Sequence, residues 1–223
     1  MLDKHLIAKI RPLADPANIV FFGDFRVTVL SDRLFRIEHD AERIFCDEAT
    51  EAVWFRDMPP VPFTAEEDGD VLRVKTEKAE LVLCEELEKS HVILGGKKIP
   101  LDNEENLRGT YCTLDNCEGG NNIDWQGKRP PQPIELDMGV ASKNGVAVLD
   151  YTKSSVLLEN GMVVKDRRDD LDIYVFAYGH DYRGALQDFF RLTGAVPLIP
   201  KYALGNWWSR YKAYTQEEYQ TLM

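Results

Sequence analysis

The chain has 223 residues, of which 44% are hydrophobic and 29% are charged, the composition of an ordinary globular protein. This length is enough for one large domain with a sizeable core or for two small domains. The net charge of −11 argues against binding to nucleic acid or to an anionic membrane surface, because both ligands attract basic patches. The acidity is expected to keep the protein soluble.

The N-terminal residues resemble no secretion signal, because Met1–Ile10 contains an aspartate and lacks a long apolar core. No run approaches the roughly 18 apolar residues of a membrane span. Four scattered cysteines, Cys46, Cys84, Cys112 and Cys117, are expected to be reduced thiols. Cys112 and Cys117 lack a second ligand pair at metal-binding spacing, so we expect no metal and no cofactor. These features favour a cytoplasmic protein.

Short apolar runs alternate with turn residues between positions 18 and 178. Each run is enriched in β-branched and aromatic residues, which is typical of strands. Strands are therefore expected at Ile19–Leu30, Leu34–Glu38, Val53–Arg56, Val61–Glu67, Val71–Thr76, Leu81–Glu85, His91–Leu94, Val146–Leu149, Ser155–Leu158, Met162–Val164 and Asp172–Tyr178.

Four dipeptides mark the strongest turns: Asp68-Gly69, Gly95-Gly96, Asn144-Gly145 and Asn160-Gly161. Such pairs tolerate a positive φ at both turn positions, which a type I′ hairpin requires. Hairpins join antiparallel neighbours. More than eight short strands with almost no helix predict a mainly β fold, an antiparallel β-sandwich, and periodicity alone leaves a barrel as the alternative.

A long irregular region, Pro100–Pro133, interrupts the strands. Loops of more than about 15 residues in compact domains are usually functional or disordered. This one contains Tyr111 and Trp125, aromatic anchors that a disordered segment would carry less often. The composition therefore favours a functional loop.

One helix is predicted over Tyr182–Leu192, with Asp181 as its N-cap and Gly194 as its C-terminal cap. Its apolar side chains form a single stripe, made of Ala185, Leu186, Phe189 and Phe190. Burial of the two phenylalanines is expected to stabilise docking of the helix by roughly 3–6 kcal/mol. The helix would fasten the sandwich to the segment that follows.

The C-terminal residues predict the beginning of a strand–helix repeat. Pro197 and Pro200 exclude a helix, and the apolar run Tyr202–Trp208 then predicts a buried strand. Thr215 and Glu218 form a capping box that starts a helix. We therefore expect a β-sandwich domain at 1–180, a linking helix and linker at 181–200, and the start of a second domain at 201–223. A strand without neighbours would be disordered, folded against the sandwich or paired with another copy.

Three motifs resemble glycoside hydrolase family 31, the α-glucosidase family. Pro197–Tyr211 (PLIPKYALGNWWSRY) resembles the start of the catalytic barrel, and Asn106–Asp115 and Tyr178–Gly194 resemble the N-terminal domain. The resemblance implies a sandwich of the galactose-mutarotase type followed by the first strand of a truncated (β/α)8 barrel. It also implies an enzyme that hydrolyses α-linked glucosides with retention.

The family's two catalytic aspartates lie on later barrel strands, which nothing in this sequence matches. Such a barrel needs about 250 residues, and only about 20 follow the linker. We therefore assign no catalytic residue and expect these 223 residues alone to be inactive. The implied partner is an α-linked oligosaccharide or glucoside, and the oligomeric state is not predicted.

Two residues are candidates for sugar binding by this resemblance. Asp115 lies in a segment similar to a loop that offers an aspartate to sugar hydroxyls, and a carboxylate accepts strong hydrogen bonds from such groups. The alternative is that Asp115 caps its own turn. Tyr214 follows the expected first barrel strand, where an aromatic ring would pack on a sugar face; the alternative is an exposed loop tyrosine. Trp207 and Trp208 are expected to be core residues.

Two other functions remain open from the sequence. A sandwich with a long aromatic loop is compatible with a stand-alone carbohydrate-binding module. A mutarotase-like enzyme would use a histidine and a carboxylate as acid and base. The four histidines are dispersed, which argues against the second reading.

Overall fold

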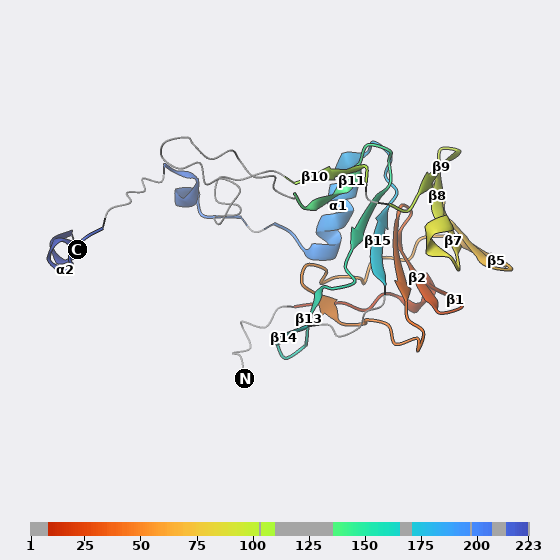
Figure 1. Ribbon diagram of the computed structural model, residues 1–223, viewed down its shortest axis with the longest axis horizontal. Coiled ribbons are helices and arrows are strands. Elements are labelled where there is room, and N and C mark those ends of the chain that lie inside the picture. The colour runs from red at the N-terminus through yellow and green to blue at the C-terminus, as the bar shows by residue number, and fades with distance from the viewer. Residues whose placement is uncertain are drawn as a thin grey trace.

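The computed structural model describes residues 9–102, 104–109, 136–165, 171–196, 198–206 and 213–222. Within these ranges the protein is mainly β, and every pairing between its named strands is antiparallel. Figure 1 shows the strands gathered into one body, with the C-terminal elements lying away from it. The prediction of an antiparallel, mainly β fold is confirmed.

Two five-stranded sheets form the body. The central sheet has the order β1-β2-β3-β15-β12, from Ile19–Phe22, Phe25–Ser31, Leu34–His39, Asp172–Phe176 and Ala147–Asp150. The second sheet has the order β5-β6-β7-β8-β9, from Thr64–Asp68, Val71–Lys75, Glu80–Cys84, His91–Leu94 and Lys97–Pro100.

Smaller elements surround these sheets. A two-stranded ribbon pairs β10 with β11 (Asn106–Arg108 and Met138–Ser142), and a three-stranded sheet has the order β14-β13-β4 (Val163–Lys165, Ser155–Leu157 and Ala49–Thr50). The helices are α1 and α2, at Tyr182–Thr193 and Gln216–Leu222. Short 3-10 turns occur at Pro16–Asn18, Leu87–Lys89 and Lys201–Leu204.

The main core lies between the two large sheets, which makes the body a β-sandwich. Alternate residues of the central sheet, such as Val29 and Phe35, meet Leu72, Leu81 and Val92 of the second sheet, and all five are at most 2% exposed. The strict alternation follows from the two-residue period of a strand. Burial of these side chains is the principal source of stability for this layer.

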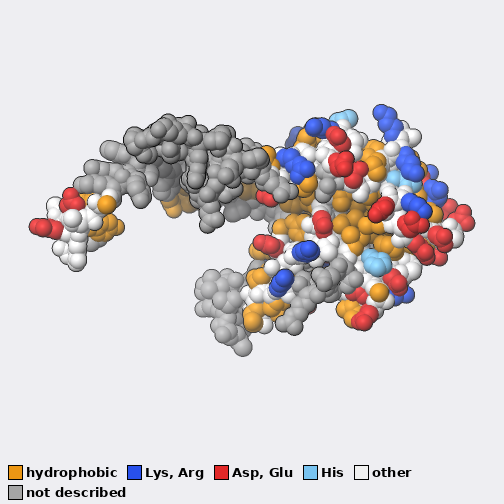
Figure 2. All heavy atoms as spheres, viewed as in Figure 1, with side chains coloured by type: hydrophobic (Ala, Val, Ile, Leu, Met, Phe, Trp, Pro, Cys, Tyr) orange, Lys and Arg blue, Asp and Glu red, His pale blue; other side chains and the backbone are white. Residues whose placement is uncertain are grey.

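A second core lies on the opposite face of the central sheet. There Leu34, Tyr174 and Phe176 pack with Ala185 and Leu192 of α1. The order of layers is therefore second sheet, central sheet and α1, and Figure 1 shows α1 beside β11 and β15, away from the second sheet. Figure 2 shows charged side chains of both signs interspersed at the end of the body formed by the second sheet.

Three of the four predicted hairpin turns are confirmed, although only one has the predicted backbone. Gly95 and Gly96 both have positive φ, 56° and 78°, between β8 and β9. In the β5–β6 and β13–β14 hairpins only Gly69 and Gly161 have positive φ. The residues before them keep negative φ because non-glycine residues adopt the left-handed region at a cost.

The expectation of a hairpin at Asn144-Gly145 is wrong. The strand before it, β11, pairs with β10, and the strand after it, β12, pairs with β15. Gly145 instead allows a close approach of two backbones: its carbonyl accepts a hydrogen bond from the Gly179 N–H at 2.9 Å, and an added Cβ would lie 3.0 Å from Gly179 Cα. Its φ of +99° also favours glycine.

Two predicted strands are wrong. Ile19–Leu30 is not one strand, because Gly23, with φ +52°, turns the chain between β1 and β2. Val53–Arg56 makes only an isolated bridge between Phe55 and Arg11. The N–H groups of Trp54 and Phe55 donate to the Leu192 carbonyl at the end of α1, so they are not available to a sheet.

Helix α1 and its caps are confirmed. The Asp181 carboxylate accepts a hydrogen bond from Gly184 N–H at 3.0 Å, and Gly194 ends the helix with φ +93°. The predicted burial of both phenylalanines is wrong for one of them. Phe189 packs against the second core, whereas Phe190 is 40% exposed. Each helical residue turns by about 100°, so Phe190 lies farther round than Phe189 and misses the sheet.

The C-terminal segment differs from the expected strand. Residues Lys201–Leu204 form a 3-10 turn, while Trp207 and Trp208 lie outside the described residues. The capping box is confirmed: the Thr215 N–H donates to the Glu218 carboxylate at 2.9 Å, and the Glu218 N–H donates to Thr215 Oγ1 at 3.3 Å. Helix α2 has no buried residue.

Within the described ranges, neither α-helix has the length and apolarity that a membrane crossing requires.

Candidate functional site: the groove beside helix α1

A groove of about 900 Å³ lies between α1 and the strands β11 and β12. One wall is the outer side of α1. The other is formed by β11, the end of β12 and two short segments, 51–52 and 153–154. Its lining includes Glu51, Asp137, Asp150, Lys153, Leu186, Phe189 and Phe190.

The groove has an apolar wall on α1 and acidic residues elsewhere in its lining, which we call the rim. Leu186 and Phe190, one helical turn apart on α1, are 46% and 40% exposed. Three carboxylate residues and one lysine supply the charged part of the lining, Glu51, Asp137, Asp150 and Lys153. A surface of this kind suits an apolar partner that carries positive charge. An apolar partner without such charge would take the carboxylates out of water unpaired, which costs free energy.

A buried hydrogen-bond network fixes α1 to the central sheet. The Tyr178 hydroxyl donates to Asp188 on α1 and lies 3.1 Å from Ser31 Oγ, while Asp188 also accepts from Arg191 at 2.6 Å. Burial, with a further contribution from the hydrogen bond to Asp188, raises the pKa of Tyr178 above its usual value. The helix wall of the groove is therefore held in one position.

The beginning of α1 is fixed by Arg33. Its Nη1 donates to Asp181 at 2.8 Å, and its guanidinium lies 4.4 Å from the centre of the Tyr178 ring. The hydrogen bond from the Gly184 N–H, and after it the contact with Arg33, lower the pKa of Asp181. The carboxylate thus stays charged as it caps the helix.

The opposite wall depends on a pair of buried arginines in the central sheet. Arg36, at 2% exposure, makes two hydrogen bonds to Asp172 at 2.8 and 2.6 Å, and an ion pair with Glu38 at 3.0 Å. Arg26 makes two hydrogen bonds to Glu38 at 2.7 and 3.0 Å. Burial opposes the charge of Arg36 and is the largest single influence on its pKa, but Asp172, Tyr174 and Glu38 together more than offset it, so the arginine pKa is raised.

These arginines hold the segment that runs from residue 40 to residue 57. Both donate to the Cys46 carbonyl, at 3.2 Å from Arg26 and 3.0 Å from Arg36. Arg56 fixes the C-terminal end of this segment to the central sheet by donating a hydrogen bond to the Tyr174 hydroxyl at 2.8 Å. It also donates to the Glu48 carbonyl within the segment at 2.7 Å. Glu51 and Ala52, which line the groove, lie inside this fastened segment.

The structure describes only one of the two predicted sugar-binding residues, Tyr214. Asp115 lies outside the described residues, as do Trp207, Trp208, Cys112 and Cys117. Tyr214 lies just before α2, where its ring meets Tyr219 edge-to-face at 6.2 Å, and it does not line the groove. Sugar binding by Asp115 and Tyr214 therefore stays a prediction.

The rim residues Glu51, Asp137 and Asp150 were not predicted, because they lie on three segments far apart in the sequence. The expectation of a single buried apolar stripe on α1 is wrong in part. Ala185 and Phe189 face the second core, whereas Leu186 and Phe190 are exposed and line the groove. Their spacing of four residues is the signal in the sequence that could have found this apolar wall.

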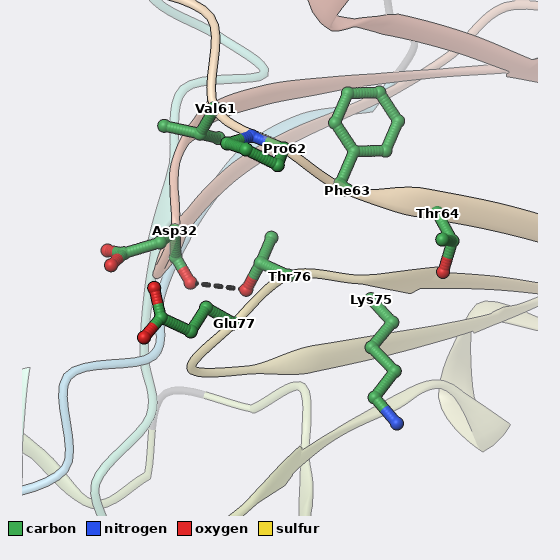
Figure 3. Close-up of a pocket in the computed structure, with 8 residues that line it drawn as sticks. All are labelled: Asp32, Val61, Pro62, Phe63, Thr64, Lys75, Thr76 and Glu77. Atoms are coloured by element: carbon green, nitrogen blue, oxygen red, sulfur yellow. Dashed lines mark hydrogen bonds between the residues drawn. The ribbon is translucent and has the colours of Figure 1, made fainter.

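A second, smaller cavity of about 470 Å³ opens where the β2–β3 turn meets the start of β5 and the end of β6 (Figure 3). Val61, Pro62 and Phe63 lie along one side, and Asp32, Thr76 and Glu77 lie across from Val61 and Pro62. Asp32 is paired with Lys78 at 2.7 Å, and its carbonyl accepts a hydrogen bond from Thr76 at 2.6 Å.

Within the described ranges, no three or more His, Cys, Asp or Glu side chains come together as a metal site. Cys46 and Cys84 are free thiols.

The chain was compared with known proteins. No protein-family profile and no curated protein sequence matches it. Solved structures with a similar arrangement include the Flavobacterium johnsoniae GH31 dextranase complexed with glucose, at 17% identity and a TM-score of 0.44. A mutant of that dextranase complexed with isomaltotriose follows at 16% and 0.43, and a GH31 α-xylosidase from a soil metagenome complexed with xylose at 14% and 0.44.

The alignments cover 81%, 81% and 84% of this chain but only 27%, 27% and 35% of those chains. The chain thus spans about a third or less of the length of these three structures. Because all three TM-scores are below 0.5, these likenesses do not decide the family or the activity.

Proposed function

We propose that this chain is the N-terminal β-sandwich of a GH31-type glycoside hydrolase that cleaves α-linked glucosides with retention. Its role is to support the catalytic domain and to contribute a loop, with Asp115, to the substrate site. The three sequence motifs described above support this assignment. In this proposal the catalytic carboxylates belong to a domain that follows residue 223, so residues 1–223 alone are inactive.

One structural observation carries the proposal: the exposed apolar side chains are concentrated on the C-terminal side. Of the 16 exposed large hydrophobic residues in the described part of the chain, ten lie at or after Tyr182. They are Tyr182, Leu186, Phe190, Val196, Leu198, Ile199, Tyr202, Leu204, Tyr219 and Leu222. This gathering of exposed apolar side chains in the last part of the sequence is what the proposal expects, because a domain that follows residue 223 would cover them.

Hydrolysis of p-nitrophenyl α-D-glucopyranoside tests the proposal. Residues 1–223 are expected to release no nitrophenol, whereas the polypeptide encoded by the whole reading frame is expected to hydrolyse the substrate and release it. In that longer polypeptide, Leu186→Asp with Phe190→Asp is expected to lower activity by loosening the supporting face, while Phe21→Asp, at another exposed position, is the control. Turnover by residues 1–223 alone, or an inactive whole polypeptide, would overturn the proposal.

A second candidate function is a carbohydrate-binding module, which the cavity in Figure 3 favours. Its lining combines the apolar residues Val61, Pro62 and Phe63 with polar residues that include Thr76 and Glu77. Sugars combine an apolar face with hydroxyl donors, and ligand sites commonly pair an apolar lining with a few polar groups.

Isothermal titration of residues 1–223 with maltose and isomaltose separates the two functions. If the chain is a carbohydrate-binding module, we expect a measurable heat of binding. Glu77→Gln should reduce this heat, and Glu88→Gln, at an exposed position outside the cavity, should leave it unchanged. If the chain is instead the supporting domain of a hydrolase, we expect neither maltose nor isomaltose to bind to residues 1–223.

A further inference from the structure

One edge of the central sheet is completed by a side chain instead of a strand. Strand β12 is the last in the order β1-β2-β3-β15-β12, and β15 is its neighbour in that sheet. Alternate residues of an edge strand turn their N–H and C=O groups away from the sheet, where these groups need other partners. Val148 of β12 does so, and both its N–H and its C=O bond to the side chain of Asn106.

The Asn106 amide joins three strands. Its Oδ1 accepts from the Val148 N–H at 3.4 Å, while its Nδ2 donates to the Val148 carbonyl at 3.0 Å and to the Gly139 carbonyl on β11 at 3.1 Å. Asn106 is only 4% exposed, so these bonds lie away from water. A primary amide carries a donor and an acceptor side by side, as the backbone of a neighbouring strand does, whereas an ionised aspartate has no donor and a leucine has neither. The contact therefore depends on the amide.

This contact lies within the ribbon formed by β10 and β11. Backbone hydrogen bonds close the ribbon on either side of Asn106: the Lys143 N–H donates to the Glu105 carbonyl at 3.0 Å, and the Gly109 N–H donates to the Asp137 carbonyl at 2.8 Å. The register of the two strands shifts between these bonds, and such irregularities change the direction of a strand. The ribbon is thus held to itself by its backbone and to the central sheet by Asn106.

The ribbon leads into and out of residues 110–135, the stretch of the sequence that contains Asp115. Strand β11 also supplies Met138 and Val140 to the lining of the groove beside α1. We propose that Asn106 is a positioning residue for sugar binding: its amide sets the direction in which the chain leaves the sandwich at residue 109 and returns at residue 137. Asn106 acts through Asp115 and needs no contact of its own with the sugar. The positioning role rests on the proposed function, in which Asp115 belongs to the substrate site.

Amide hydrogen exchange of the full 223-residue chain, followed by NMR, tests the contact itself without any sugar. Asn106→Leu keeps nearly the size of the side chain and removes all three hydrogen bonds. The Val148 amide is expected to exchange at least about tenfold faster than in wild type, because it opens to water locally. An unchanged exchange rate of Val148 in this variant would overturn the proposal.

Asn18→Leu is the matched control, the same substitution at another buried asparagine, whose Nδ2 donates to the Met58 carbonyl at 3.4 Å. It accelerates exchange of the Val148 amide only as far as it lowers the stability of the whole protein, so it supplies the baseline. Equal acceleration of Val148 in Asn18→Leu and Asn106→Leu would also overturn the proposal, because the effect would then not come from the ribbon.

Hydrolysis of p-nitrophenyl α-D-glucopyranoside by the whole polypeptide tests the positioning role. Asn106→Leu is expected to raise KM roughly tenfold, the effect of one lost hydrogen bond to a charged group, and to leave kcat within about twofold. A merely structural role would instead lower the amount of folded enzyme, and with it the apparent kcat, while KM stayed unchanged. Asn106→Ser, a smaller polar side chain, provides the same test if the leucine variant does not fold. Asn18→Leu is expected to leave KM unchanged.

The kinetic outcomes separate the positioning role from the proposed function. A whole polypeptide that is active, and whose KM is the same in wild type and in the Asn106 variants, would overturn the positioning role and leave the proposed function standing. A whole polypeptide that is inactive with its wild-type sequence would overturn the proposed function, and the positioning role with it.

Discussion

The buried arginine Arg36 offers the sharpest test of how the groove wall is held. We predict that Arg36→Met, which keeps much of the side chain's volume, strongly destabilises the protein. The substitution removes two hydrogen bonds to Asp172, the ion pair with Glu38 and the bond to the Cys46 carbonyl. Asp172, only 7% exposed, then loses its paired cation.

Removing one partner of a buried ion pair typically costs about 3–5 kcal/mol, because the remaining charge stays buried without compensation. The expected loss is therefore a large part of the 5–15 kcal/mol that usually separates folded from unfolded protein. At about 2–4 °C per kcal/mol for a chain of this size, the melting temperature should fall by roughly 6–20 °C. Urea unfolding followed by circular dichroism measures the loss directly.

The exposed pair of Arg73 and Glu80 provides the matched control. Arg73→Met removes an ion pair of 3.1 Å whose arginine side chain is 49% exposed, and such surface pairs contribute only about 0–1 kcal/mol. The double substitution Arg36→Met with Asp172→Leu should recover much of the lost stability, because the second change removes the stranded carboxylate. If Arg36→Met costs no more than Arg73→Met, the network does not hold the wall as described.

Two further predictions concern alkaline pH and the base of the long loop. Burial raises the pKa of Tyr178 above about 10, the value in an unfolded chain, so above that pH the unfolded state loses a proton that the folded state keeps. The free energy of unfolding therefore falls as pH rises. In urea titrations, Tyr178→Phe should make this fall shallower by up to about 1.4 kcal/mol per pH unit, whereas Tyr202→Phe, at an exposed position, should leave the slope unchanged. An unaltered slope in Tyr178→Phe would contradict the prediction. Gly139→Ala would place a Cβ 2.6 Å from the Leu107 carbonyl oxygen, so it should destabilise the β10–β11 ribbon by about 1–3 kcal/mol in the same assay, and an unchanged midpoint would show that the two strands separate freely.

Local backbone chemistry is what the sequence predicted best. The caps of α1 and the reciprocal capping box at Thr215 depend on side chains within three residues of the groups they bond, so their spacing is visible in the sequence. The hairpin at Gly95-Gly96 is similar, because the two glycines supply the positive φ that the turn needs. Such features need no knowledge of distant contacts.

Long-range partners explain the failures. Val53–Arg56 has strand-like residues, yet its amides bond to the end of a helix 137 or more residues away, which no local pattern reveals. Arg36 and Arg26 occupy strand positions that would be exposed in a two-layer sandwich, but the segment 40–57 covers them. The groove rim was missed for the same reason, since its carboxylates come from separate segments.

Proton NMR of the whole polypeptide acting on p-nitrophenyl α-D-glucopyranoside tests most directly whether this β-sandwich belongs to a retaining α-glycosidase. We expect the α-anomer of glucose to appear first, followed by slow conversion to the β-anomer, and no glucose from residues 1–223 alone. Initial release of the β-anomer, no glucose from the whole polypeptide, or glucose from residues 1–223 alone would contradict the proposal.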